Sequence, residues 1–220
     1  MLLSRINLTE EDFEHAKILY EEEKIHPINE ENMFRAGLYC ILSAAEKYKK
    51  HREVYGTLLE AKLDTPKKIK ADKEKLRNLI RKIRFPNLKT ERIYNFALWW
   101  LESSLPGEIL EDIESGRRRE FELRNRLAEE APGIGYKGAS FFMVKCGYQN
   151  VVPIDIHMIR FLYSLGFDVE IPDYRRRSGL SPKDYLEYER IISEIAKEFN
   201  IPPPLFQFTV WYKSTLNKRR

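Results

Sequence analysis

The residues with the clearest chemical potential in this sequence are a lysine and an aspartate, Lys137 and Asp155, which are 18 positions apart. We expect Lys137 in the first turn of a helix, where the helix dipole favours an uncharged amine. Asp155 precedes an apolar run that begins at Ile156, so we expect it to cap that helix as a carboxylate. A free amine beside a fixed carboxylate suits attack on an electrophilic sugar carbon and formation of a Schiff base. The spacing alone leaves open a lysine that only binds a phosphate.

The segment before Lys137 predicts a helix-hairpin-helix. One helix is expected to end near Glu130, and the sequence Pro-Gly-Ile-Gly then forms a hairpin before the next helix. Gly133 and Gly135 permit positive φ and a close backbone approach. Their N–H groups, together with the start of the following helix, would suit one phosphate of a DNA backbone. Glycines between two helices are common, so this pattern alone is weakly specific.

Composition excludes several classes of protein. The 220 residues are 43% hydrophobic and 33% charged, as in a globular chain rather than a disordered one. Two cysteines cannot build a disulfide scaffold, a four-cysteine iron–sulfur cluster or a cysteine-based zinc site. No apolar stretch is long enough for a membrane span or a secretion signal, which favours a cytoplasmic protein without a membrane partner. The abundance of Lys, Glu and Arg is weakly typical of a thermophile.

The net charge of +4 is concentrated in the C-terminal half of the chain. Three clusters carry much of it: Arg117-Arg118-Arg119, Arg175-Arg176-Arg177 and Lys218-Arg219-Arg220. Such clusters suit a polyanion such as nucleic acid, although solvated helix faces and tails are an equally good interpretation.

Apolar residues recur at helical spacing along most of the chain, and alternating strand patterns are nearly absent, so we predict an all-α fold. A helix is expected to start after Thr9, and the further predicted helices cover 31–50, a segment from Pro66 through Ile83, 89–103, 117–130, 137–145, 156–163, 182–199 and 205–215. The sequence Leu105-Pro106-Gly107 is interpreted as a break. We expect two helical lobes. Residues 1–30 would be an N-terminal helix packed on the C-terminal lobe, 31–115 a helical lobe, and 116–220 the helix-hairpin-helix lobe.

Residues 131–162 resemble the helix-hairpin-helix DNA glycosylases, whose signature is Leu-Pro-Gly-Val-Gly-x-Lys followed by Val-Asp-x-His. The chain has Ala131-Pro132-Gly133-Ile134-Gly135-Tyr136-Lys137 and then Ile154-Asp155-Ile156-His157. The resemblance implies that Lys137 is the lyase nucleophile and Asp155 the catalytic carboxylate. It implies DNA contacts for four further residues: Gly133, Gly135, Gly138 and His157. The implied partner is double-stranded DNA with a damaged base, bound by a monomer that needs no cofactor or metal. The resemblance also implies a DNA-binding cleft between the two lobes, a base-recognition tail at the end of residues 116–220, and association with the nucleoid.

The C-terminal sequence, from Phe206 to the basic end, is similar to the tail of the archaeal-type (type 2) 8-oxoguanine DNA glycosylase/AP lyases. This resemblance implies that Trp211 stacks on the flipped base, that Arg220 reaches the damaged guanine, and that Phe85 is a second stacking aromatic. Leu216 and Arg220 depart from the family's glycine and terminal lysine, and Arg and Lys are not equivalent donors. Ordinary core roles for Phe85 and Trp211 stay open. Two other functions also stay open: an endonuclease III-like glycosylase for oxidised pyrimidines, and a non-catalytic DNA-binding module.

Overall fold

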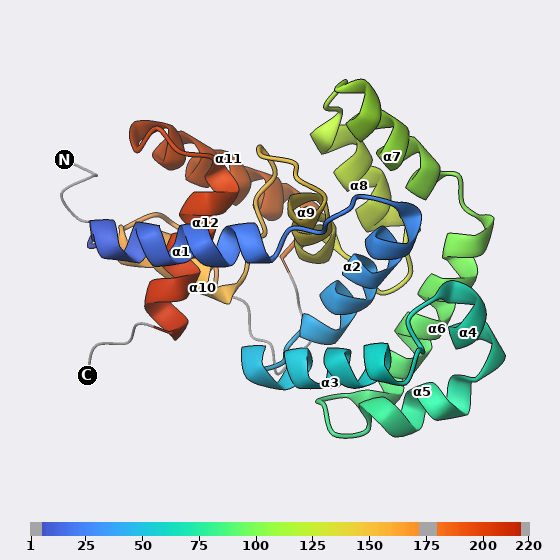
Figure 1. Ribbon diagram of the computed structural model, residues 1–220. Helices are drawn as coiled ribbons and strands as arrows, with labels where there is room; N and C mark the ends of the chain where they lie inside the picture. The colour runs from blue at the N-terminus through green and yellow to red at the C-terminus, as the bar shows by residue number, and fades with distance from the viewer. Residues whose placement is uncertain (1–5, 172–179, 217–220) are drawn as a thin grey trace. The chain divides into compact units, whose positions relative to one another are not determined.

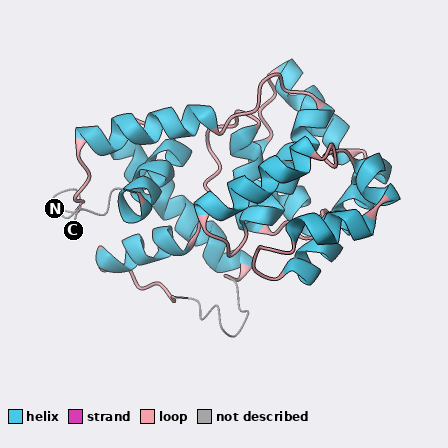
Figure 2. Cartoon of the chain, turned by 60° about the horizontal axis from the view of Figure 1, so that its bottom comes forward, coloured by secondary structure: helices cyan, strands magenta, loops and turns pink. Residues whose placement is uncertain are grey.

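The computed structural model describes residues 6–171 and 180–216, and helices joined by loops make up these ranges, with no strand among them (Figures 1 and 2). This confirms the all-α prediction. The twelve helices are α1 (Glu10–Glu22), α2 (Glu30–Ser43), α3 (Tyr48–Glu60), α4 (Pro66–Ala71), α5 (Lys73–Ile80), α6 (Pro86–Glu102), α7 (Leu105–Ser115), α8 (Glu120–Glu130), α9 (Tyr136–Lys145), α10 (Ile156–Ser164), α11 (Pro182–Glu198) and α12 (Pro203–Thr215). Within the described ranges, none of them combines the length and apolar character that a bilayer span requires.

The chain divides into two compact units. Unit 1 consists of Met1–Lys24 and Gly147–Arg220, and unit 2 is the continuous segment Ile25–Cys146. The sequence analysis placed the seam at residue 116 instead. The difference arises because α9 packs on α2 as well as on α8, so the two hairpin helices belong with the helices that precede them.

Unit 2 is built on an aromatic core between α2, α6 and α9. Phe34 stacks on Phe96 with ring centroids 5.4 Å apart, and Trp100 meets both rings edge-on. Gly37 lets α2 approach α6 closely, because a Cβ atom there would lie 2.3 Å from the Phe96 ring. Trp100 also contacts Phe142 on α9, so the second hairpin helix is anchored in this core.

Unit 1 is organised around α12, which packs on α1, α10 and α11. Phe206 of α12 lies at the centre of an aromatic cluster, with Phe161 and Phe199 within 5.6 Å and 5.4 Å between ring centroids. Helix α1 begins with the expected capping box, in which Thr9 and Asp12 each accept a hydrogen bond from the other's backbone.

Helix boundaries differ from the predictions at several places. The segment predicted from Pro66 through Ile83 forms two helices, α4 and α5, because Asp72 ends the first and caps the second. The helix predicted over 31–50 ends at Ser43, and Ala45 adopts a left-handed φ of 53° before α3 begins. The predicted break at residue 105 is instead the start of α7. Pro106 lies in the first turn of this helix, where proline is tolerated. The helix predicted from Arg117 begins three residues later, at Glu120.

Candidate functional site

The hairpin between α8 and α9 is shaped by glycine at two positions. Gly133 has a φ of 80°, and a Cβ atom there would lie 2.7 Å from the Cβ of Arg92 on α6, so both its conformation and its surroundings require glycine. Gly135 has a φ of −97°, so of the two glycines only Gly133 uses the positive φ that glycine permits. The backbone of Gly135 lies exposed at the N-cap of α9, with no atom within 4 Å of a Cβ position. The amides of the first turn therefore face an open surface suited to a phosphate.

A buried arginine clamps the two hairpin helices together. Arg124 of α8 is fully buried, and its Nη1 donates a 2.7 Å hydrogen bond to Ser140 Oγ on α9. Its guanidinium also lies over the Tyr136 ring, 5.3 Å from the centroid. Both partners flank Lys137 on α9, so this clamp fixes the helix that carries the candidate nucleophile. Gly138 allows the start of α9 to lie close to the hairpin, since a Cβ atom there would lie 3.3 Å from the Ile134 side chain.

Lys137 is the second residue of α9, so it lies in the first turn of a helix as predicted. Its side chain is half-buried. Its Nζ lies 5.1 Å from the centroid of the Phe141 ring, one turn further along the helix. The face of an aromatic ring attracts a cationic side chain. The side chain is therefore held beside the hairpin, on the same unit as Gly133, Gly135 and Gly138.

Asp155 is the N-cap of α10, which is the position predicted from the sequence. Its Oδ1 accepts hydrogen bonds from the backbone of His157 (2.9 Å) and Met158 (3.1 Å). Among the described residues, both hydrogen bonds that this carboxylate accepts end on Oδ1 and not on Oδ2. The cap fixes the carboxylate at the positive end of the α10 dipole.

The segment that leads to Asp155 is held by two residues of α11. Glu189 is buried and accepts a 2.7 Å hydrogen bond from the Val152 amide. The Tyr185 hydroxyl accepts from the Ile154 amide (3.1 Å) and donates to the Val152 carbonyl (2.6 Å). The sequence analysis missed this pair. Its signal is a carboxylate on the otherwise apolar stripe of α11, a position where a charge needs a partner.

His157 makes an internal contact that a purely DNA-binding role does not predict. Its Nδ1 lies 2.8 Å from Ser214 Oγ on α12, and the same hydroxyl donates to the Trp211 carbonyl at 3.0 Å. Trp211 itself is half-buried, in the second half of α12. Unit 1 thus brings the start of α10 to the end of α12. Arg220 lies outside the described residues.

Phe85 lies at a strained corner of unit 2, just before α6. It adopts a left-handed φ of 56°, precedes Pro86, and is 54% exposed, which rules out a role as a core residue. The corner is fixed by Glu46, whose carboxylate accepts hydrogen bonds from the amides of Arg84 (2.6 Å) and Lys47 (2.9 Å). Burial raises the pKa of Glu46, but these two hydrogen bonds together with the positive charges of Lys89 and Arg84 outweigh it, so the pKa falls below its ordinary value.

A buried lysine supports the same corner. Lys89 is 2% exposed and donates a 2.6 Å hydrogen bond to the carbonyl of Leu42, at the end of α2. Burial, together with the positive charges of Arg92, Arg84 and Lys137, lowers the pKa of Lys89 to about 8 against the attraction of Glu46. The exposed ring of Phe85 therefore lies at a corner that hydrogen bonds fix and that several basic side chains adjoin.

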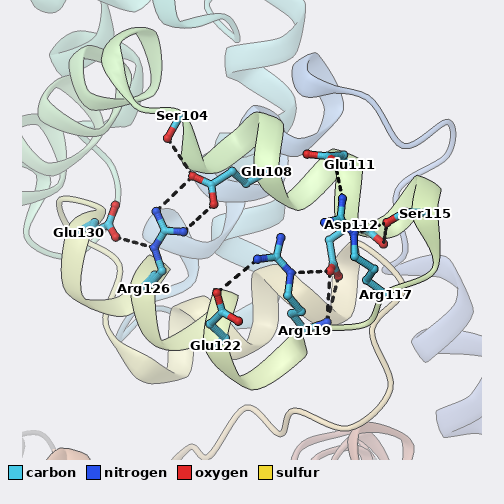
Figure 3. Close-up of polar contacts among 10 residues, drawn as sticks. All are labelled: Ser104, Glu108, Glu111, Asp112, Ser115, Arg117, Arg119, Glu122, Arg126 and Glu130. Atoms are coloured by element: carbon cyan, nitrogen blue, oxygen red, sulfur yellow. Dashed lines mark hydrogen bonds and ion pairs between the residues drawn. The ribbon is translucent and has the colours of Figure 1, made fainter.

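Arg117 and Arg119 of the first arginine cluster form ion pairs within the protein. Figure 3 shows that α7 and α8 are joined by a network in which Arg117 pairs with Glu111 and Arg119 pairs with the buried Asp112 at 3.1 Å. Arg126 extends this network to Glu108 at 2.6 Å. These contacts favour the structural interpretation over a DNA footprint for Arg117 and Arg119. The other two clusters lie outside the described residues.

Comparisons with known proteins agree with the geometry. The profile of the family described as 8-oxoguanine DNA glycosylase (Ogg-HhH) matches residues 16–201. The chain is 29% identical over 185 residues to an 8-oxoguanine DNA glycosylase/AP lyase of Methanocaldococcus jannaschii, covering 84% of this chain and 81% of the relative. A relative of the same description from Sulfolobus acidocaldarius is 26% identical over 206 residues, covering 91% of this chain and 92% of the relative.

Solved structures show the same relationship. The M. jannaschii 8-oxoguanine glycosylase/lyase in complex with DNA containing 8-oxoguanine aligns with a TM-score of 0.69 and 27% identity, covering 96% of this chain and 89% of that one. The 8-oxoguanine DNA glycosylase of Thermotoga maritima aligns with a TM-score of 0.68 and 26% identity, covering 92% and 86%. On the family match over most of its length, this chain belongs to the 8-oxoguanine DNA glycosylase family, in agreement with the archaeal-type resemblance.

Proposed function

We propose that this chain removes 8-oxoguanine from double-stranded DNA and then cleaves the strand at the resulting abasic site. The proposal rests on the positions of Lys137 and Asp155 in a chain that matches the 8-oxoguanine DNA glycosylase family over most of its length. Lys137 opens the helix after a glycine hairpin, and Asp155 caps α10 through its Oδ1 atom. The relatives described above bear the name of this activity, and one of them was crystallised with DNA containing 8-oxoguanine.

The mechanism assigns one role to each of these two residues. The damaged nucleotide is flipped out of the duplex. The Asp155 carboxylate stabilises the positive charge that develops on the sugar as the glycosidic bond breaks. Lys137 Nζ forms a bond to C1′ while the base leaves with the electron pair of the broken bond and takes up a proton. Proton loss from nitrogen and opening of the sugar ring give the Schiff base.

Strand cleavage follows from the Schiff base. The imine acidifies the C2′ proton, and its removal expels the 3′ phosphate by β-elimination. Hydrolysis then frees Lys137. The exposed amides around Gly133 and Gly135 would hold a backbone phosphate while these steps occur. Trp211, Phe85 and Arg220 are assigned to the flipped base.

Borohydride trapping tests the proposal. Wild-type protein should form a covalent complex with an 8-oxoguanine duplex, and Lys137→Gln should abolish trapping while still binding the duplex. Asp155→Asn should slow base release by about 10²-fold or more, because it removes a preorganised charge from the transition state. Lys197→Gln, an exposed lysine in the last turn of α11, is the matched control and should trap normally.

Two outcomes would contradict the proposal. Trapping that survives Lys137→Gln would exclude this lysine as the nucleophile. Faster release from a thymine-glycol duplex than from an 8-oxoguanine duplex would move the activity to oxidised pyrimidines.

A further inference from the structure

The last turn of α12 is held at three consecutive positions by two other helices of unit 1. These contacts directly follow Trp211 in the sequence. Tyr212 stacks on His15 of α1 with ring centroids 5.4 Å apart and planes within 6°; Lys213 Nζ lies 2.9 Å from Asp12 Oδ2 of α1; and Ser214 Oγ lies 2.8 Å from His157 Nδ1 of α10. A helix end that is restrained on two sides has little freedom to turn or fray.

Asp12 is the most strongly fixed member of this set. Its side chain is 1% exposed, and its Oδ2 also accepts hydrogen bonds from the amide and hydroxyl of Thr9, both at 2.9 Å. A buried carboxylate is costly unless it is paired, so it strongly favours the conformation that brings Lys213 to it. Because Asp12 is buried, it cannot contact DNA. Any effect of this residue on the reaction is therefore indirect, and its ion pair with Lys213 connects it to α12.

We propose that Asp12 is a positioning residue for base excision, acting through Lys213 to hold the last turn of α12 and thereby Trp211. The inference rests on the proposed function, in which Trp211 contacts the flipped base. The His157–Ser214 hydrogen bond ties the same turn to the start of α10, where Asp155 lies. The ion pair therefore helps to set the base-recognition helix in register with the catalytic carboxylate.

Two substrates separate this role from a general loss of folding. Release of 8-oxoguanine requires recognition of the base, whereas cleavage of a preformed abasic site requires Lys137 but offers no base to recognise. A displaced Trp211 should slow the first reaction and spare the second. A partly unfolded protein should lose both.

The test is a double-mutant cycle under single-turnover conditions. Asp12→Asn and Lys213→Met should each slow 8-oxoguanine release by on the order of tenfold, since small displacements of binding groups have effects of this size or larger. The double variant should be no slower than the slower single variant, because both changes break the same contact. Lys213→Arg should restore most of the rate, and cleavage of abasic DNA should stay within about twofold throughout.

Two control variants separate the ion pair from a loss of surface charge and from a loss of stability. Lys197→Met removes a lysine from the last turn of the neighbouring helix α11 and should leave both reactions unchanged. Ser181→Ala weakens the cap of α11, which does not involve Asp12 or Lys213, so it should lower stability without changing the ratio of the two rates.

Each contrary outcome has a distinct meaning. An equal loss on both substrates would make the ion pair merely structural. A loss of DNA binding in Lys213→Met but not in Asp12→Asn would make Lys213 a phosphate contact, and additive effects in the cycle would also refute the inference. Wild-type protein that cleaves abasic DNA but does not release 8-oxoguanine would instead refute the proposed function.

Discussion

The two aromatic residues assigned to the flipped base are positioned in different ways. Trp211 lies in a regular helix, and side chains from α1 and α10 hold that helix near its end. Phe85 lies at a corner whose own backbone is left-handed, and Glu46 and Lys89 fix the corner through hydrogen bonds with main-chain groups. Trp211 therefore depends on tertiary packing, whereas Phe85 depends on local conformation.

This difference predicts how each region responds to change. A residue on a packed helix moves when a distant partner is lost, even if its own backbone is unstrained. A residue in a sparsely populated backbone conformation stays in place only while its surroundings enforce that conformation. The comparison can thus be tested by removing the rings, the buried charge and the backbone strain in turn.

The largest effect is expected from removal of the rings. Phe85→Leu and Trp211→Leu should each slow 8-oxoguanine release roughly tenfold or more, because stacking of an aromatic side chain on a base is worth about 1–3 kcal/mol. Cleavage of abasic DNA should change far less. Single-turnover release of the base measures the effect, and Tyr163→Leu, an exposed aromatic of α10, is the control. Full activity in either variant would remove that aromatic from the base-recognition set.

A pH-dependent effect of up to about 3 kcal/mol is expected from Lys89, whose pKa burial lowers from 10.5 to about 8. Between these values the unfolded chain binds more protons than the folded one, so the free energy of unfolding should rise with pH from about 8 to about 10.5. Lys89→Met should lack this rise. Urea unfolding followed by the fluorescence of Trp99 and Trp100 measures the difference between the two proteins. If the difference in the free energy of unfolding between the two proteins stays constant with pH, the pKa of Lys89 is not lowered in the folded protein.

The smallest effect is the difference in stability between a Gly and an Ala variant, which should have opposite signs at Phe85 and Trp211. At Phe85, Gly should be more stable than Ala by about 1 kcal/mol, because glycine tolerates the left-handed conformation. At Trp211, Gly should be less stable than Ala by a similar amount, because glycine weakens a helix interior. Chemical unfolding of the four variants measures both differences. The same sign at both sites would contradict the distinction between a strained corner and a regular helix.

Local features of the molecule were predictable from the sequence, and tertiary ones were not. The caps at Thr9 and Asp155 and the hairpin before Lys137 depend on residues a few positions apart, so their patterns were readable. The Glu189 and Tyr185 contacts join residues more than 30 positions apart, and no spacing rule indicates such partners.

The same limit applies to charge. Arg119 is in a basic run that equally suited DNA or a solvated face, and its role became clear only from the position of the buried Asp112. The end of α2 at Ser43 was missed because the following left-handed Ala45 is not a residue that usually marks a turn.

The contact between α1 and α12 also bears on the order in which the protein can be made. Asp12 and Lys213 are 201 positions apart, and the whole of unit 2 lies between them in the chain. During synthesis, unit 2 can complete its own core while α1 still waits for its partner, since domains generally fold as continuous units from the N-terminus. Unit 1 can close only after α12 has left the ribosome. Under the proposed function, a nascent chain therefore carries the hairpin and Lys137 before α12 can take its place and Trp211 can meet a flipped base.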